Sequence, residues 1–481
     1  MIDLGNGMEQ VFVVDWLDHD PENPFNWSSA KKYANVIVAV LITTLTAANA
    51  TSTAILAEWG PERFNCSREQ YILSSTVFLI TVAFTPLVLA PLSEVFGRMW
   101  IYQITGLINA LLFIPQALSP SYSGLLAARW FQGMCASVGN SMVGGTVADL
   151  FFPKDRGLAM NVFSIMIFLG QSLGGFVFGW VGNGWGIQWC YGVQGIAAVV
   201  SCGLNALILR ETRGDVLLAR RAKALTKETG SKHICVADLQ KQSFITLMRV
   251  SLIRPLEYLV TEPIVSAIST WIGFAWAIIF LGGTSVQLVF RAYGFSIGQA
   301  GTVQVCVFLG GVLGFISNFH QDRLYARAAR KNGGRAPPEA RLYWAAYGGL
   351  LFPLGMYVYA WTSRPGSIPW PVPAVFLTIS YWGVFCMYSG TFTYLADAYE
   401  TYSSSAQAAQ SFARNFASGI FPLFGHQMYI AMGYPQATTL VASVALFLSI
   451  APILLVRYGH VLRARSRVAS ALQREAEEAE K

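Results

Sequence analysis

The chain has 481 residues, of which 54% are hydrophobic and only 12% are charged, and its formal net charge at pH 7 is +7. Soluble domains carry about 25% charged residues, so this composition argues against a soluble enzyme and favours a membrane protein. The seven cysteines form no CxxC pair, and the five histidines form no cluster with them, so we expect no metal site, no cofactor and no disulfide framework.

The first segment, residues 1–32, is polar and acidic, and it lacks the pattern of a signal peptide. We interpret it as a cytosolic N-terminal tail. Twelve apolar segments follow, each close to the length of about 20 residues that crosses a bilayer. They lie at about 33–57, 71–91, 101–119, 122–147, 157–181, 187–209, 263–290, 297–318, 342–361, 370–395, 404–430 and 435–457.

Polar stretches at 210–262 and 319–341 interrupt this series, and the first leaves six apolar segments on each side. The sequence therefore predicts an N-terminal six-helix bundle at 33–209, a cytosolic linker at 210–262, a C-terminal six-helix bundle at 263–458 and a cytosolic C-terminal tail at 459–481. Part of the linker, "VLLARRAKAL", has helical spacing with one apolar side. Two interpretations stay open, a linker that lies on the anionic inner leaflet and a solvated tether.

The positive charges follow the predicted topology. With both termini in the cytosol, nearly all of the 33 Lys and Arg residues fall on inner segments. The outer loops hold Arg63, Arg68, Arg291 and Arg364. This distribution obeys the positive-inside rule, so the basic charge indicates membrane topology and predicts no nucleic-acid partner. We expect a monomer in the lipid bilayer of the plasma membrane, with a vacuolar or vesicle membrane as the alternative.

The stretch "APLSEVFGRMWIY" joins the second and third segments through a tight turn at Gly97. Glu94 and Arg98 stand four residues apart at the membrane edge. An acid and a base in this position can pair across helix ends and hold two bundles in one conformation. The alternative is a plain turn with flanking charges.

This stretch resembles the loop signature of the major facilitator superfamily, roughly G-x-L-[SA]-[DE]-x-x-G-R, with Ala90 in place of the leading glycine. "HQDRLYAR", with Asp322 and Arg323, is similar to a weaker repeat of the signature in the second half. The resemblance implies an all-α fold with twelve transmembrane helices in two six-helix bundles. It also implies a conformational latch made of Glu94, Gly97, Arg98, Asp322 and Arg323.

Glycines in the fifth and eighth apolar segments have the small-xxx-small spacing that lets helices approach closely. The predicted helix-packing residues are Gly170, Gly174, Gly175, Gly179, Gly310 and Gly314. The fifth segment resembles the glycine- and proline-rich motif of the antiporter branches of the superfamily, although Gln171 and Gly175 replace its usual prolines. The fold of the superfamily implies that the fifth and eighth segments pack together.

Four further stretches, "EPIV", "GGRAPPEARL", "YLADAY" and "SFARNFASGIFPLFG", resemble the fungal twelve-span drug:proton antiporter group. That group includes polyamine exporters, multidrug pumps and pumps encoded beside secondary-metabolite genes. The resemblance runs from about residue 20 to residue 467. It implies proton-coupled efflux of small organic molecules by alternating access; a polyamine exporter, and an importer or facilitator of a small solute, are the alternatives.

Arg129 is a charged residue inside an apolar segment, and "RWFQGMCAS" around it is similar to the R-x-x-Q-G signature of the same superfamily. Gln132 lies on the same helical face. Glu58 is the one acid near the outer half of the predicted spans, so we expect Arg129 to set the protonation state of Glu58, or of a substrate group, and thereby couple transport to protons. A structural role, with Arg129 bonded to neutral polar groups, is the alternative.

Amide and aromatic residues near mid-depth are candidates for the substrate cavity, since transporter sites lie near the midplane between the two halves. They are Asn49, Gln132, Gln171, Gln287, Tyr381 and Tyr388. The predicted spans hold almost no acids, which favours uncharged, aromatic or weakly acidic cargo over polycations.

Two further residues have predicted roles outside the substrate cavity. Arg414, in the eleventh segment, is expected to pair with Asp397 or Glu400 and to anchor the inner helix ends. Asn65 belongs to an N-x-S/T sequon on the predicted outer side, where glycosylation can occur.

Overall fold

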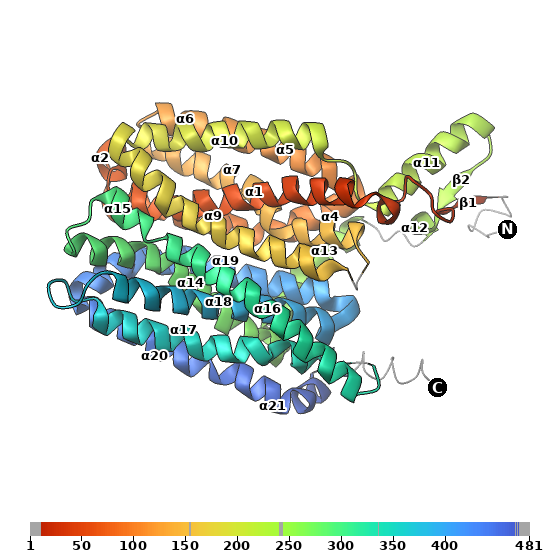
Figure 1. Ribbon diagram of the computed structural model, residues 1–481. Coiled ribbons are helices and arrows are strands. Elements are labelled where there is room, and N and C mark those ends of the chain that lie inside the picture. The colour runs from red at the N-terminus through yellow and green to blue at the C-terminus, as the bar shows by residue number, and fades with distance from the viewer. Residues whose placement is uncertain are drawn as a thin grey trace.

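The computed structural model describes residues 11–152, 155–239, 244–334, 336–466, 468 and 470. These residues are mostly helical, which confirms the predicted all-α class. Long helices lie side by side in one bundle, and α1 begins at the same end of the bundle at which α21 ends (Figure 1).

Six helical segments form the first half, and they correspond to the first six predicted spans. They are α1 (Ser29–Leu56), α3 (Arg68–Phe84) with α4 (Pro86–Phe96), α5 (Arg98–Leu111) with α6 (Phe113–Leu118), α7 (Tyr122–Ser141) with α8 (Val143–Leu150), α9 (Arg156–Trp185) and α10 (Ile187–Ile208). The short helix α2 (Gly60–Phe64) follows α1. The chain bends by 46° between α3 and α4, where Pro86 lacks the N–H that would continue the helix.

Six helical segments form the second half. They are α14 (Pro263–Ala292), α15 (Ile297–Thr302) with α16 (Val305–Lys331), α17 (Tyr343–Thr362), α18 (Pro371–Tyr399), α19 (Ser403–Met432) and α20 (Tyr434–Leu448) with α21 (Ile450–Arg465). Three 3₁₀ turns complete the connections, η1 (Pro24–Asn26), η2 (Pro338–Leu342) and η3 (Glu400–Tyr402). The halves meet where α3 packs against α19 and where α9 packs against α15 and α16.

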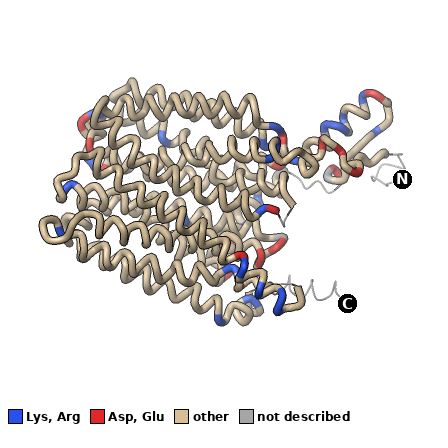
Figure 2. Tube along the Cα trace, in the orientation of Figure 1, with Lys and Arg blue, Asp and Glu red and all other residues tan. Residues whose placement is uncertain are grey.

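Hydropathy separates two kinds of helix. Within the described residues, eight helices are long and apolar enough to cross a membrane, and the bent pair α3–α4 makes a ninth. The predicted spans outside this set are α7 with α8, α17 and α19, which carry more polar and tyrosine residues. Lys, Arg, Asp and Glu gather at the two ends of the bundle, and the length between the ends carries very few of them (Figure 2). A band so poor in charged residues is the pattern of a membrane protein.

The N-terminal segment and the linker form a small unit beyond one end of the bundle (Figure 1). Strand β1 (Phe12–Val14) pairs in parallel with β2 (His233–Cys235), next to α11 (Gly214–Thr229) and α12 (Val236–Leu239). Arg221 Nη1 lies 2.6 Å from Asp20 Oδ2, and its side-chain hydrogen bond holds the pKa of Asp20 below its usual value. The sequence predicted a separate tail and linker; the structure joins them.

The last linker helix, α13 (Phe244–Thr261), lies against the bundle instead of in the small unit. Its Ser251 hydroxyl donates a hydrogen bond of 2.9 Å to the backbone oxygen of Leu87 in α4. The linker therefore contacts both halves.

Glycines of α9 bring three helices to close approach. A Cβ on Gly170 or Gly174 would collide with α1, at the backbone oxygens of Thr44 and Ala48. Gly175 instead faces Gln304 of the other half, and Gly179 faces both Ile55 of α1 and Gly298 of α15. The fifth span, α9, therefore packs against the eighth span, α15 with α16, as predicted.

The glycines of α16 divide between two neighbours. Gly310 and Gly314 face Tyr381 and Phe385 of α18. Gly311 faces Phe168 of α9 and makes the contact to the fifth span. The close approach that we expected from Gly310 and Gly314 is therefore made to the tenth span, because these two glycines lie on the face of α16 turned away from α9.

Candidate functional site

Two adjoining cavities lie between the halves. Each has a cavity volume of about 30 Å³. Ala50 of α1, Gln171 of α9 and Phe280 of α14 line both, so the two cavities together form one central space. Arg414 is the one charged side chain among the described residues that line this space, and no acid is among them.

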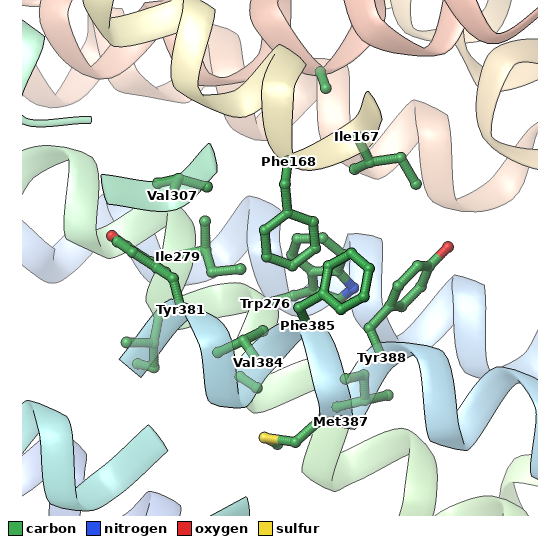
Figure 3. Close-up of a cluster of buried hydrophobic side chains, with 14 of the residues drawn as sticks. Ile167, Phe168, Trp276, Ile279, Val307, Tyr381, Val384, Phe385, Met387 and Tyr388 are labelled. Atoms are coloured by element: carbon green, nitrogen blue, oxygen red, sulfur yellow. The ribbon is translucent and has the colours of Figure 1, made fainter. Parts of the chain in front are cut away.

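An aromatic cluster bridges the halves beside the second cavity (Figure 3). Phe168 of α9 reaches across to the second half, with its ring centroid 5.5 Å from that of Trp276 and 5.1 Å from that of Phe385. Tyr388 lies against Trp276, with ring centroids 5.4 Å apart. Such offset and edge-to-face pairs add to the apolar burial that holds the halves together.

Of the six predicted cavity residues, Gln171 lines the central space. Its Oε1 is buried and has no hydrogen-bond partner. Tyr381 and Tyr388 belong to the aromatic region next to the space (Figure 3). Gln287 is buried in α14 outside the described lining.

The other two predicted cavity residues, Asn49 and Gln132, surround Arg129, which is 0% exposed. Arg129 Nη1 donates to Asn49 Oδ1 at 2.6 Å and to Gln132 Oε1 at 3.4 Å, and Nη2 donates to Thr53 Oγ1 at 3.3 Å. Its Nε has no partner, and the ring of Tyr191 lies 5.8 Å away. Neutral oxygens, not a carboxylate, therefore hold this charge.

Arg414 lies in a different environment, on the wall of the second cavity. Its guanidinium lies 5.3 Å from the ring centroid of Trp276 and 5.2 Å from that of Tyr388. Arg414 forms no ion pair with Asp397 or Glu400 within the described residues, and Asp397 binds Arg341 instead. The reason is position along the helix: α19 begins at Ser403, so Arg414 lies about 16 Å inside the bundle at 1.5 Å per residue.

Glu58 closes one end of the central space, called here the Glu58 end. Its carboxylate binds Arg68 of the same half at 2.9 Å and Arg291 of the other half at 2.5 Å. Gln427 of α19 donates a second hydrogen bond between the halves, 3.0 Å long, to Glu69. Glu58 forms no ion pair with Arg129 among the described residues, although the sequence predicted that the two act together. Helix α1 connects them instead, because Arg129 binds Asn49 and Thr53 of α1 and Glu58 follows the end of that helix.

The opposite end, called here the Arg98 end, carries the predicted latch. Arg98 Nε lies 2.5 Å from Asp149 Oδ2 of α8, and both side chains are 9% exposed. The Glu211 carboxylate accepts the backbone N–H of Arg98 at 3.0 Å. Gly97 has a φ of +96° and faces the same carboxylate, leaving no room for a side chain. Glu94 is exposed, so Asp149 takes the place that the sequence assigned to Glu94.

The second half repeats this arrangement with different residues. Arg341, just before α17, pairs with Asp397 near the end of α18 at 2.8 Å, as Arg98 pairs with Asp149 near the end of α8. Asp322 and Arg323 of the predicted repeat are exposed and make no ion pair within the described chain. The sequence does carry a signal for this repeat. Asp149 in "VADL" (147–150) and Asp397 in "YLADAY" each stand near the end of an apolar segment.

One hydrogen bond joins the halves near the Arg98 end. Asn318 Nδ2 of α16 donates to Asn161 Oδ1 of α9 at 2.8 Å. The central space is therefore bounded by contacts between the halves at both ends.

The predicted glycosylation residue lies at the Glu58 end. Asn65 is exposed and follows α2 with a φ of +47°. An exposed loop position is the environment that such a modification needs.

Known proteins resemble this chain in sequence and in fold. The model of the Major Facilitator Superfamily matches residues 36–422. The chain is 34% identical to the efflux pump radE of Floropilus chiversii, over 95% of this chain and 85% of that one. It is 33% identical to the MFS-type efflux pump MFS2 of Trichophyton rubrum, over 97% of this chain and 79% of that one.

Solved structures agree on the fold. A POT family transporter in complex with 5-aminolevulinic acid superposes with a TM-score of 0.63 at 10% identity, over 88% of this chain and 96% of that one. A peptide transporter POT mutant with sulfate gives a TM-score of 0.62 at 16% identity, over 89% and 95%. The resemblance inferred from the motifs is confirmed, and the chain belongs to the major facilitator superfamily.

Proposed function

We propose that this protein exports small organic molecules from the cytosol in exchange for protons, by alternating access to the central space. The main support is the space itself, which lies between two six-helix halves and is bounded at each end by contacts between them. Rocking of the halves can exchange one set of contacts for the other. The relatives named efflux pumps support the outward direction.

We assign the Arg98 end to the cytosol, because the positive-inside rule favours it. Both termini are then cytosolic, and the plasma membrane is the proposed location. The absence of acids from the described lining of the central space argues against a polyamine cargo, because a polycation in an apolar space needs carboxylates.

Glu58 is the proposed proton-sensitive gate at the outer end. Its two ion pairs exist only while the carboxylate is charged, and the Arg291 pair ties α1 to α14 of the other half. Protonation from an acidic exterior would remove both pairs and favour opening.

Arg129 is the proposed coupling residue, acting through α1 and not by contact with Glu58. It holds Asn49 and Thr53 on the same helix that ends beside Glu58. Asn49 and Glu58 are nine residues apart, about 13 Å along a helix. A shift of α1 when the outer gate opens would therefore disturb the hydrogen bonds of Arg129, inside the bundle.

Flux in sealed vesicles tests the proposed function. The purified protein is reconstituted with the Arg98 end outward, and three radiolabelled probes are added outside: naphthalene-2-sulfonate, naphthalene-2-sulfonamide and N-methylquinolinium. An acidic lumen is expected to drive accumulation of at least one probe, with matching alkalinisation of trapped pyranine. A protonophore should abolish both signals. Accumulation that ignores the pH gradient, or no accumulation of any probe, would overturn proton-coupled export.

A further inference from the structure

We propose that the second cavity is a binding site for an organic anion, with Arg414 as the counter-ion and an aromatic wall for the body of the cargo. This inference rests on the proposed function, since it names the class of molecule that is exported. It concerns a different arginine from the one that the sequence signature singles out.

The first argument is the incomplete environment of Arg414. The side chain is 6% exposed, and the hydrogen bond of its guanidinium is a long one, 3.4 Å from Nη2 to Ser411 Oγ. No acid forms an ion pair with it in the described chain. A guanidinium has five N–H donors, and a buried charge without a partner is costly. An anion in the cavity would supply the missing partner.

The second argument is the set of polar groups around the charge. Trp276 lines the same cavity, and its Nε1 donor is buried without a partner. Asn140 and Asn415 line the cavity as neutral amides that can also donate, whereas the Ser418 hydroxyl already donates to the backbone oxygen of Arg414. An acceptor-rich head group such as a carboxylate or sulfonate can use several of these donors at once.

The third argument is the shape of the wall. The rings of Trp276 and Tyr388 lie 5.3 and 5.2 Å from the Arg414 guanidinium and 5.4 Å from each other, so they are neighbours on one side of it. Figure 3 shows them together with Phe168 and Phe385, and Trp276 lines the cavity itself. Phe280 belongs to the lining of both cavities. A cargo that fits an aromatic wall beside a single cation is an aromatic or apolar body with one acidic group.

Arg129 supplies the contrast within the same bundle. Three neutral oxygens already accept its hydrogen bonds, and it is not among the described residues that line either cavity. Of these two arginines, Arg414 is therefore the one whose charge an incoming molecule meets. A cationic cargo would meet like charge without any lining acid to offset it.

Binding of two nearly isosteric probes tests this inference. Naphthalene-2-sulfonate and naphthalene-2-sulfonamide differ in charge and hardly in shape. The purified protein is expected to bind the sulfonate at least about tenfold more tightly, as a charge-assisted hydrogen bond predicts. Arg414→Gln should remove that preference, Arg414→Lys should keep part of it, and sulfonamide binding should change by less than about threefold in either variant.

Arg364→Gln is the matched control. Arg364 lies 5.3 Å from the ring centroid of Trp361, so it has the same cation–π distance as Arg414, but it is exposed at the Glu58 end. This variant should keep the sulfonate preference of the unmodified protein. Because the comparison of the two probes on the unmodified protein needs no variant, poor folding of Arg414→Gln does not leave the inference untested.

Several results would overturn the anion site: equal affinity for the two probes, tighter binding of N-methylquinolinium, no sulfonate binding at millimolar concentration, or an unchanged preference in Arg414→Gln. The two proposals fail separately. Proton-driven flux of the sulfonamide or the quinolinium without a sulfonate preference rejects the anion site and keeps export. Sulfonate binding that depends on Arg414, without proton-driven flux, rejects export and keeps the site.

Discussion

Arg129 and Arg414 are both buried in the interior of the bundle, but the groups around them differ. Arg129 is held by neutral oxygens from its own helix and from α1. Arg414 faces a cavity, with the adjacent rings of Trp276 and Tyr388 next to its guanidinium. A buried charge persists in a membrane protein when it has partners or a function. The first arginine therefore connects helices, and the second is available to a ligand.

Replacing Arg129 by Ala is expected to lower pH-driven efflux by at least about a hundredfold, because each buried acceptor left unpaired costs about 1–3 kcal/mol and the link between α1 and α7 is lost. Arg129→Lys should retain partial activity, since one ammonium can reach only some of these oxygens. Transport is measured in vesicles per molecule of folded, membrane-inserted protein. Unchanged transport in Arg129→Ala would reject the coupling role.

At this scale the sequence identified Arg129, Gln132 and Asn49, because polar residues inside apolar segments are visible without a structure. It could not identify their contacts, since helical spacing relates residues on one helix and says nothing about which helix lies opposite. The pairs Arg98–Asp149 and Arg341–Asp397 were missed for that reason. Arg414 was expected to pair with an acid at the inner helix ends, although its position eleven residues after the start of α19 places it too deep in the bundle to reach one.

At the scale of helices and turns, the Arg98 end depends on a pair of residues far apart in the chain. Arg98 begins α5 and Asp149 stands near the end of α8. Breaking a buried ion pair by removing one partner costs about 3–5 kcal/mol, whereas an exposed charge contributes little. The two acids near this turn, Asp149 and Glu94, should therefore differ sharply when replaced.

We expect Asp149→Asn to lower the melting temperature in detergent and to slow turnover more than it weakens substrate binding. Glu94→Gln is the matched control, because it removes an exposed carboxylate at the same end and should change stability by less than about 0.5 kcal/mol. Thermal unfolding and the separate measurement of kcat and KM check this prediction. If the two variants have equal effects, Asp149 is not the latch partner.

Close packing of α9 against α1 gives a second prediction at this scale. Gly174→Ala should destabilise the protein by about 1–3 kcal/mol, because the added methyl group collides with the backbone oxygen of Ala48. Gly203→Ala is the control, since a Cβ on Gly203 meets nothing within 4 Å and the better helix propensity of Ala should be neutral or stabilising. Thermal unfolding of both variants is the measurement, and a Gly174→Ala protein as stable as the unmodified one contradicts the packing.

The apolar pattern located the twelve predicted spans, because the membrane imposes an apolar length on each of them, although α7 with α8, α17 and α19 are less apolar than the others. It was not sufficient for the strand pair β1–β2, whose two strands have three residues each and lie more than 200 residues apart. Pairing of that kind leaves no periodic pattern in the sequence. The three-residue strands therefore appear only in the structure.

At the scale of the whole molecule, contacts between the halves bound the central space at both ends. Glu58–Arg291 closes one end and Asn161–Asn318 lies near the other. The two-bundle division was predictable from the polar linker at 210–262, since six apolar segments lie on each side of it. Which residues form the closing contacts was not predictable, because they come from helices of different halves.

Glu58→Gln is expected to increase opening of the Glu58 end. Exposed ion pairs contribute about 0.2–1 kcal/mol each, so the loss of two pairs predicts roughly two- to thirtyfold faster labelling of a cysteine at Ala54, which lines the first cavity. An impermeant maleimide, added at the Glu58 end of a variant without the seven native cysteines, reports the rate. Glu62→Gln, an exposed acid at the same end, is the control. Equal rates in both variants would exclude Glu58 as the gate.

Reciprocal motion of the two ends is the central claim, and spin-label distances measure it most directly. One label pair replaces Glu62 and Arg364 at the Glu58 end, and the other replaces Val95 and Asn332 at the Arg98 end; all four side chains are exposed. Acidification on the Glu58 side is predicted to lengthen the first distance while the second stays the same or shortens. If both ends open together, or if neither distance changes under conditions that support transport, the account of alternating access is contradicted.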